Sequence, residues 1–303
     1  MTYDMCMGIG AALETWKTDP DIAIVVIDAE GSRSFCSGGD IADLYKTGLE
    51  GNYDYGRKFW ADEYRINEKI KNYPKPYVAI MDGIVMGGGV GISAHGSHRI
   101  VTENTMFAMP ECGIGLVPDV GGNFLLSRAE GSIGEYLAAT AARLNASDCI
   151  YAGIADSFVP EDDLPELIKS LETNSDVSII NEFARECVPG DLALNQKTIN
   201  THFSKANAVD IIASLEADNG RMGNHGRKTY ASQLSALSHE VLGYDTSPDV
   251  LENAKEARII TCATAVDAAS EAETLITMLP NGEILLSCHG RSNSCNAKRC
   301  TLD

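Results

Sequence analysis

The chain has 303 residues, of which 44% are hydrophobic, so it can hold one large domain or two modest ones around a substantial core. A net charge of −19 argues against a nucleic-acid groove or an anionic membrane surface as the main partner. No apolar run is long enough to span a bilayer, and the first ten residues resemble neither a signal peptide nor an Arg-rich transit peptide. Nine cysteines without a C-x-x-C pair predict a reducing compartment, and the tail cluster of cysteines and His289 is poorly spaced for zinc.

Helical and extended patterns alternate along the chain and predict an α/β protein with crossover connections. The predicted helices are 7–17, 57–72 and 133–142, followed by a mostly helical region over 161–240. The predicted strands are 22–27, 77–80, 106–109 and 155–159. A glycine pair at 38–39 is followed by Asp40, which is well placed to cap a helix. Surface positions are the default expectation for Asp62 and Glu63 on the helix 57–72.

Glycine is concentrated in residues 76–125, the stretch around which the rest of the chain is arranged. A strand pattern runs into Met86-Gly87-Gly88-Gly89 and then a helix start, so free N–H groups at this turn can stabilise a developing negative charge. Glu111 follows the next strand, and Asp119 lies in a second glycine-rich stretch. This pattern predicts an oxyanion hole with an acid or base beside it. A turn cap for Asp119 and a surface strand end for Glu111 are the structural alternatives.

With those residues in hand, residues 1–238 resemble the enoyl-CoA hydratase/isomerase (crotonase) superfamily, and within it the 3-hydroxyisobutyryl-CoA hydrolases. The motifs that carry the resemblance are SFCSGGDI (34–41), EYRIN (63–67), the stretch 75–128 and YAGIADSFV (151–159). The resemblance implies a spiral of β-β-α repeats that binds acyl-CoA. The expected architecture is an acyl-CoA-binding core over 1–160, lacking the strands with which the family begins, and a helical region over 161–240.

The resemblance also implies the site residues. Gly39 and Gly88 would supply the backbone N–H groups of the oxyanion hole. Glu111 would act as nucleophile or general base at the thioester carbonyl, with Glu63 and Asp119 orienting the substrate hydroxyl and the water. Substrate binding would therefore involve Glu63, Gly88, Glu111 and Asp119. Carboxylates that share one small cavity should raise at least one pKa, which suits a base near neutral pH.

Two other functions stay open. Hydratases of the superfamily use two glutamates, and here the first of those positions is Gly91, which disfavours an enoyl-CoA hydratase or isomerase. A catalytically silent crotonase-like binding or assembly module would fit the absent N-terminal stretch that contacts CoA in the family. Retention of Glu63, Glu111 and Asp119 favours the hydrolase.

Residues 241–287 resemble a different family, the 3-hydroxyisobutyrate dehydrogenases. They predict a partial Rossmann-like β-α-α-β fragment with strands at 241–245 and 274–279, and the polar segment 288–303 is predicted to be disordered. No G-x-G-x-x-G turn precedes Val241, so we expect no NAD binding and no cofactor or metal. Acyl-CoA is the expected partner, with no nucleic acid or membrane. Exposed sheet edges predict a homo-oligomer, in a mitochondrial matrix or a bacterial cytoplasm.

Overall fold

The computed structural model describes residues 1–31, 33–114 and 116–217, and four short segments at 242–243, 260–263, 274–277 and 299–302. The chain divides into two compact units. The first comprises Met1–Cys112 and Val117–Thr201, and the second comprises Gly113–Leu116 and His202–Asp303. The sequence-based boundary at residue 160 therefore falls inside the first unit, whereas the helical region from 161 onward is divided between the two.

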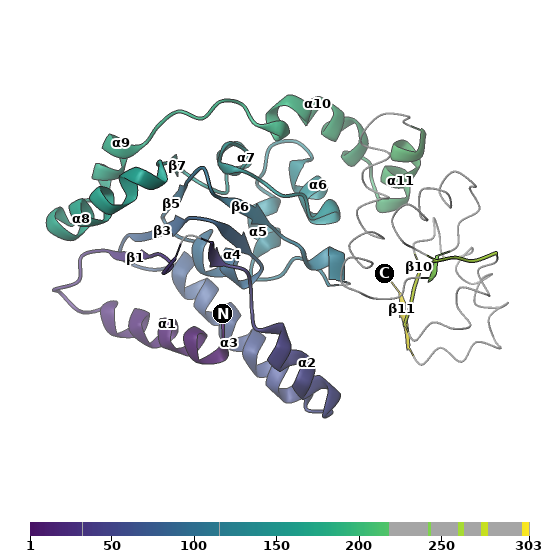
Figure 1. Ribbon diagram of the computed structural model, residues 1–303, viewed down its shortest axis with the longest axis horizontal. Helices are drawn as coiled ribbons and strands as arrows, with labels where there is room; N and C mark the ends of the chain where they lie inside the picture. Colours follow the sequence, from purple (N-terminus) through teal and green to yellow (C-terminus); the bar gives the residue numbers. More distant parts are fainter. Residues whose placement is uncertain are drawn as a thin grey trace. The chain divides into compact units, whose positions relative to one another are not determined.

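Two parallel sheets form the centre of the first unit (Figure 1), and consecutive strands enter them alternately. One sheet has the order β1-β3-β5-β7 and the other has the order β2-β4-β6. Their bounds are β1 Val25–Ile27, β2 Ser34–Cys36, β3 Tyr77–Met81, β4 Ile84–Met86, β5 His98–Val101, β6 Met106–Ala108 and β7 Ser157–Phe158. Because the chain adds one strand to each sheet and then crosses through helix, it winds as a spiral. The predicted α/β fold with a crotonase-like spiral is confirmed.

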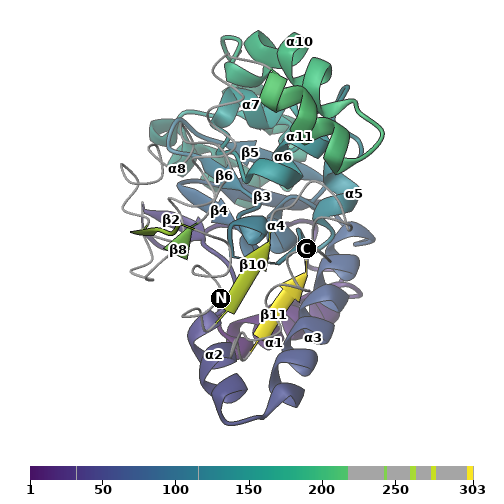
Figure 2. The ribbon, with the colours of Figure 1, turned by 90° about the vertical axis from the view of Figure 1, so that its right-hand side faces the viewer.

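Local capping explains where the first helices begin. The Thr2 side chain accepts from the Met5 N–H at the start of α1 (Tyr3–Trp16). Asp40 accepts from the Ala42 N–H, as predicted, and begins α2 (Ile41–Leu49). Helix α3 (Tyr53–Lys71) lies beside α1 (Figures 1 and 2), tied to it by a hydrogen bond of 2.6 Å from the Tyr3 hydroxyl to Asp62.

The remaining helices of the described residues vary in length from single turns to the long helices α8 and α10. They are α4 Gly88–Ser93, η1 Glu111–Ile114, α5 Gly122–Leu126, α6 Ile133–Thr140, α7 Ala146–Tyr151, η2 Glu161–Asp163, α8 Leu164–Asn174, η3 Val177–Ile179, α9 Ile180–Phe183, α10 Asp191–Phe203 and α11 Ala208–Ala217. Helix α4 starts at the glycine triplet, as the sequence predicts. Helices α5 and α7 and strands β4 and β5 have no separate counterpart among the predicted elements, and α2 was predicted only through its Asp40 cap.

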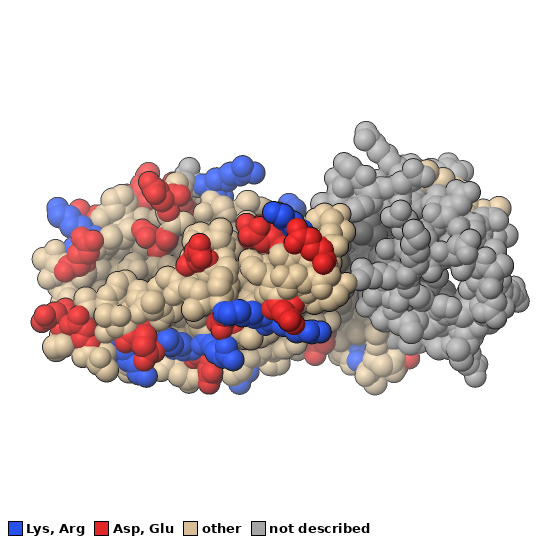
Figure 3. All heavy atoms as spheres, turned by 90° about the horizontal axis from the view of Figure 1, so that it is seen from below, with Lys and Arg blue, Asp and Glu red and all other residues tan. Residues whose placement is uncertain are grey.

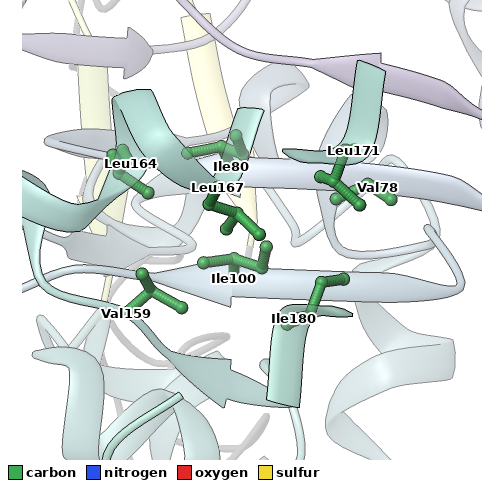
Figure 4. Packing of buried hydrophobic residues seen from close by; sticks show 8 residues of the cluster. All are labelled: Val78, Ile80, Ile100, Val159, Leu164, Leu167, Leu171 and Ile180. Atoms are coloured by element: carbon green, nitrogen blue, oxygen red, sulfur yellow. The ribbon is translucent and has the colours of Figure 1, made fainter. Parts of the chain in front are cut away.

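The hydrophobic core is built where α8 and α9 cover the sheet of β3 and β5 (Figure 4). Leu167 and Leu171 lie four residues apart on one face of α8, and both are fully buried. They pack with Val78, Ile80 and Ile100 of the two central strands. Strand β3 is buried at every position, as expected for a central parallel strand covered on both faces.

The described strands of the second unit form two parallel pairs. Strand β8 (Leu242–Gly243) pairs with β9 (Ile260–Thr261), and β10 (Thr274–Thr277) pairs with β11 (Arg299–Leu302). Strands β8 and β10 fall within the two strands predicted for 241–287, while the predicted helices between them lie outside the described residues. Within the predicted disordered segment 288–303, the described residues 299–302 are a strand.

The surface of the described region carries charges of both signs. Figure 3 shows acidic and basic side chains interspersed over one face, with no extended basic patch among the described residues of that face. None of the described helices is both long and apolar enough to cross a membrane.

Candidate active site

The two glycines predicted as oxyanion-hole donors lie side by side. Gly39 follows β2, and Gly88 is the first residue of α4 after β4, the strand that pairs with β2. A Cβ built on Gly88 would lie 3.3 Å from the Gly39 nitrogen and would collide with Glu63 Oε1. Neither N–H donates to an acceptor among the residues that the structure describes. Two adjacent, unpaired N–H groups are suited to stabilise an oxyanion.

The neighbouring glycines let these backbones approach. Gly38 has φ of 117° and Gly87 has φ of 51°, a region that side chains disfavour. A Cβ on Gly89 would collide with the Cys36 carbonyl oxygen. The glycine density in the sequence therefore reflects a close approach of the β2–α2 and β4–α4 turns.

Glu63 enters the site from α3 and is only 2% exposed. Its Oε1 is buried without a hydrogen-bond partner. Burial raises the pKa of Glu63 from 4.5 to about 7, and the charge of Asp119 adds to the increase. The default expectation of a surface position is wrong for Glu63, because this side chain points into the protein beside Gly88.

Glu111 begins η1, two residues after a buried segment that continues β6. It is 6% exposed, and its Oε2 is buried without a hydrogen-bond partner. Burial raises the pKa of Glu111 to about 7, partly offset by a hydrogen bond from its own backbone N–H, while the Asp119 charge raises it further. Its Oε1 lies 3.4 Å from the position of a Cβ on Gly87. Glu111 is therefore a buried carboxyl beside the glycine turn and not a surface strand end.

Asp119 stands at the start of a tight turn before α5. The Gly122 N–H donates to the Asp119 carbonyl at 2.6 Å, and both central residues, Val120 and Gly121, have positive φ. The Asp119 carboxylate accepts a hydrogen bond of 2.7 Å from the Tyr64 hydroxyl. The turn alternative for Asp119 is thus true of its backbone, while its carboxylate acts electrostatically on Glu63 and Glu111.

The structure therefore brings the predicted site residues together. Two buried carboxyls with pKa values near 7 and one further carboxylate lie around a pair of unpaired N–H groups. A carboxyl that titrates near neutral pH can exchange a proton with water or attack a carbonyl when it is ionised. The same N–H pair can bind the oxygen of a carbonyl whose charge increases during that step.

Asn67 occupies the space beside Gly91, the position at which hydratases of the superfamily carry their first glutamate. A Cβ on Gly91 would lie 2.6 Å from the Asn67 Oδ1 and 2.7 Å from its Nδ2. With its amide oriented to satisfy both neighbours, Asn67 donates to the Glu63 carbonyl at 3.3 Å and to the Gly91 carbonyl at 3.1 Å. Asn67 thus forms a carboxamide bridge between α3 and α4.

Sequence reasoning missed three side chains that support the site: Tyr64, Asn67 and His95. Tyr64 and Asn67 belong to the EYRIN motif quoted for the family resemblance, and this was the available signal. His95 had no such signal, because its contact is a 2.7 Å hydrogen bond between Nε2 and the carbonyl of Val120, 25 residues away.

A separate cavity of about 420 Å³ lies elsewhere in the first unit. Its walls come from the start of β5, from β7 and from the η3–α9 segment, and the Arg99–Asp156 ion pair of 2.6 Å lines it. None of the predicted site residues contributes to it. Among the described residues, no group of three or more His, Cys, Asp and Glu side chains could hold a metal ion.

A two-sheet parallel spiral with paired glycine N–H groups at its strand ends defines the class of protein. The chain belongs to the enoyl-CoA hydratase/isomerase family, whose sequence profile matches residues 1–256. A second profile, the NAD binding domain of 6-phosphogluconate dehydrogenase, matches residues 220–297. That match begins 21 residues before the segment predicted from the sequence to resemble a dehydrogenase.

Among curated proteins, the chain is similar to mitochondrial 3-hydroxyisobutyryl-CoA hydrolases. The Xenopus tropicalis protein is 43% identical over 237 residues, which cover 75% of this chain and 60% of that protein. The mouse protein is 37% identical over 229 residues, covering 72% and 59%. The chain thus spans about 60% of the length of these relatives.

Solved structures show the same fold. A structure titled as an enoyl-CoA hydratase from Rhodobacter sphaeroides is 44% identical, with a TM-score of 0.71 over 78% of this chain and 72% of that chain. A structure titled as a carnitinyl-CoA dehydratase from Mycobacterium thermoresistibile is 37% identical, with a TM-score of 0.72 over the same shares.

Proposed function

We propose that the chain hydrolyses a short 3-hydroxyacyl-CoA thioester, with 3-hydroxyisobutyryl-CoA as its substrate, to the hydroxy acid and CoA. The observation that carries this proposal is the pair of buried, unpartnered carboxyls, Glu63 and Glu111, beside the unpaired N–H groups of Gly39 and Gly88. The relatives named 3-hydroxyisobutyryl-CoA hydrolase support the choice of substrate. The corresponding step belongs to valine breakdown.

In this reaction one water is consumed, the thioester C–S bond breaks and a C–O bond forms. The N–H groups of Gly39 and Gly88 stabilise the negative charge on the carbonyl oxygen. Glu111 acts as a general base that takes a proton from the attacking water, or as a nucleophile whose acyl anhydride is hydrolysed afterwards. In both routes the proton from water finally reaches the CoA sulfur. Glu63 and Asp119 orient the substrate hydroxyl and the water.

Hydration of an enoyl-CoA is the second candidate, because one similar solved structure carries that title. A hydratase of the paired-glutamate type would need a carboxylate at position 91. There a glycine stands, with the Asn67 amide against it. This contact favours the hydrolase over the hydratase.

Thiol release from 3-hydroxyisobutyryl-CoA by the purified chain tests the proposal, with crotonyl-CoA hydration measured beside it. We expect thiol release by the parent chain and a loss of at least about 100-fold in Glu111→Gln, the scale of removing an acid–base group. Circular dichroism checks that the variant is folded. An unchanged rate in Glu111→Gln, or turnover of crotonyl-CoA alone, would refute the assignment. Absence of turnover in the folded parent chain would favour a silent module.

The proposal needs no metal and no nicotinamide cofactor. It also needs no nucleic-acid or membrane partner. Single turnover in water labelled with ¹⁸O tests the nucleophilic route, because label enters the Glu111 carboxyl only through an acyl anhydride that water attacks at the Glu111 carbonyl.

A further inference from the structure

Tyr64 follows Glu63 on α3. Its side chain does not enter the site as Glu63 does but contacts it through Asp119. Its hydroxyl donates a hydrogen bond of 2.7 Å to Oδ2 of Asp119, 55 residues further along the chain. Tyr64 is 41% exposed, yet partial desolvation, its hydrogen bond to Asp119 and the charges of Asp119, Glu63 and Glu111 all raise its pKa. Tyr64 therefore stays a protonated donor throughout the pH range in which Glu63 and Glu111 titrate.

The backbone that carries Asp119 is held independently of Tyr64. Val120 has φ of 44°, a conformation that β-branched residues rarely adopt and that costs of the order of 1–3 kcal/mol. His95, which is 5% exposed, fixes this turn through the 2.7 Å contact between its Nε2 and the Val120 carbonyl. Because a carbonyl only accepts, Nε2 carries the proton. Burial lowers the pKa of His95, so the ring is neutral near pH 7.

The Asp119 carboxylate has only one such restraint. Among the described residues, Tyr64 is its sole hydrogen-bond donor. With the backbone fixed by His95, the side chain of Asp119 could still rotate towards solvent if the phenol were absent. The backbone turn is fixed, and the Asp119 carboxylate has a single hydrogen-bond donor. Tyr64 therefore determines where this negative charge lies.

We propose that Tyr64 is a positioning residue, whose hydroxyl holds the Asp119 carboxylate where its charge acts on Glu63 and Glu111. This inference rests on the proposed function for its consequence in catalysis, since Asp119 is there assigned to orient the hydroxyl or the water. It also has a consequence without catalysis. The held charge disfavours ionisation of both glutamates, so releasing it lowers both pKa values.

The other charged and titratable groups near these glutamates stay in place when Tyr64 is changed. They are the amino group of Met1, which lowers the pKa of Glu63, and the thiol of Cys6 on α1, which Glu63 influences. A change in titration that follows Tyr64 and Asp119 together can therefore be assigned to the Asp119 charge.

The test is a double-mutant cycle of Tyr64→Phe and Asp119→Asn, with kcat, KM and the pH dependence of kcat/KM measured for each. We expect Tyr64→Phe to lower kcat about tenfold, equivalent to one charge-assisted hydrogen bond, with the acidic limb shifted to lower pH. In the Asp119→Asn background, Tyr64→Phe should have no further effect. Tyr73→Phe is the matched control, because it removes a phenol hydrogen bond of 2.8 Å to the Leu13 carbonyl, away from the site.

Three results would overturn the proposal: equal losses in both backgrounds, an unshifted acidic limb, or an equal loss in Tyr73→Phe. An activity-independent measurement keeps this test separate from the proposed function. NMR titration of ¹³C-labelled glutamate carboxyls should show lower pKa values for Glu63 and Glu111 in Tyr64→Phe and in Asp119→Asn. If the parent chain lacks thioesterase activity but these shifts occur, the proposed function fails and the positioning role of Tyr64 stands. Unshifted carboxyls would refute that role.

Discussion

At the scale of single residues, Glu63 and Glu111 link the candidate activity to the stability of the fold. Each has a pKa of about 7 in the folded chain and an ordinary value of 4.5. The folded chain therefore binds these protons more tightly than the unfolded chain does. Their stabilising contribution is complete below about pH 4.5 and is lost as the pH rises through 7. At pH 8 each ionised, buried carboxyl opposes folding.

Glu111→Gln should therefore be more stable than the parent chain at pH 8 while losing its activity. The expected difference is roughly 3 kcal/mol, from about 1.4 kcal/mol for each unit of pKa, and it should vanish near pH 4. Urea denaturation of both proteins at pH 4.5, 6 and 8 measures it. Glu14→Gln is a useful control with the opposite sign, because the hydrogen bond from Lys69 lowers the pKa of this exposed side chain. A Glu111→Gln variant less stable than the parent at pH 8 would contradict the burial argument.

The sequence could identify the groups that do chemistry but not the groups that hold them. Gly39, Gly88, Glu63, Glu111 and Asp119 lie in motifs with recognisable spacing, and the structure brings them together. The contact of Tyr64 with Asp119 depends instead on where α3 crosses the turn before α5, which local patterns do not encode. The same holds for His95, whose partner is a backbone carbonyl and so leaves no trace in the residue type of position 120.

At the scale of secondary-structure elements, α3 serves the site through three side chains. Glu63 is buried beside Gly88, Tyr64 holds Asp119, and Asn67 bridges to α4. Residues 63, 64 and 67 lie within little more than one helical turn, so they form one patch on the helix surface. A rotation or shift of α3 would disturb all three together. The position of this helix is in turn secured by its contact with α1.

The close approach of Asn67 to Gly91 predicts coupling between α3 and α4. Gly91→Ala should destabilise the chain by about 1–3 kcal/mol, because its Cβ would overlap the buried Asn67 amide. Asn67→Ala should relieve the overlap, so the double variant should lose less stability than the sum of the single variants. Gly8→Ala is the matched control. It adds a methyl group in α1 where nothing lies within 4 Å, and it should be neutral or slightly stabilising.

Urea denaturation of the four proteins in the cycle provides the measurement. Additive losses would mean that the Asn67 side chain moves away without cost. The same crowding implies that Gly91→Glu cannot by itself install the missing hydratase glutamate, since any side chain at position 91 first has to displace Asn67.

At the scale of the whole chain, the glycine turns and strands β1, β3, β6 and β7 of the first unit were predicted, but the division into two sheets was not visible in strand patterns alone. Strand β3 reads as a buried run, whereas β4 and β6 have only three residues each, too few to show a clear pattern. Which sheet a short strand joins depends on pairing partners about 20 to 50 residues away, such as Ser34 with Ile84. Resemblance to the family supplied that information.

The C-terminal part of the chain raises the question of a second ligand. The profile of an NAD binding domain begins at Gly220, so the resemblance extends further towards the N-terminus than residue 241. Residues 220–226 read GRMGNHG, with glycines three positions apart. If Gly220 and Gly223 are the second and third glycines of G-x-G-x-x-G, the first position is Asp218. These residues lie outside the described ranges.

We propose that the chain binds no NAD, because in this alignment an aspartate stands at the first glycine position of the pattern. In dinucleotide-binding folds the first glycine makes the tight turn at the pyrophosphate, and an aspartate at that position adds a side chain and a negative charge that disfavour phosphate binding. Isothermal titration of the parent chain with NAD at micromolar concentration should give no saturable binding. Asp218→Gly completes the glycine pattern, and we expect this variant to bind NAD more tightly than the parent chain does. Saturable binding by the parent chain would contradict the proposal and would show that this segment tolerates a carboxylate at the turn.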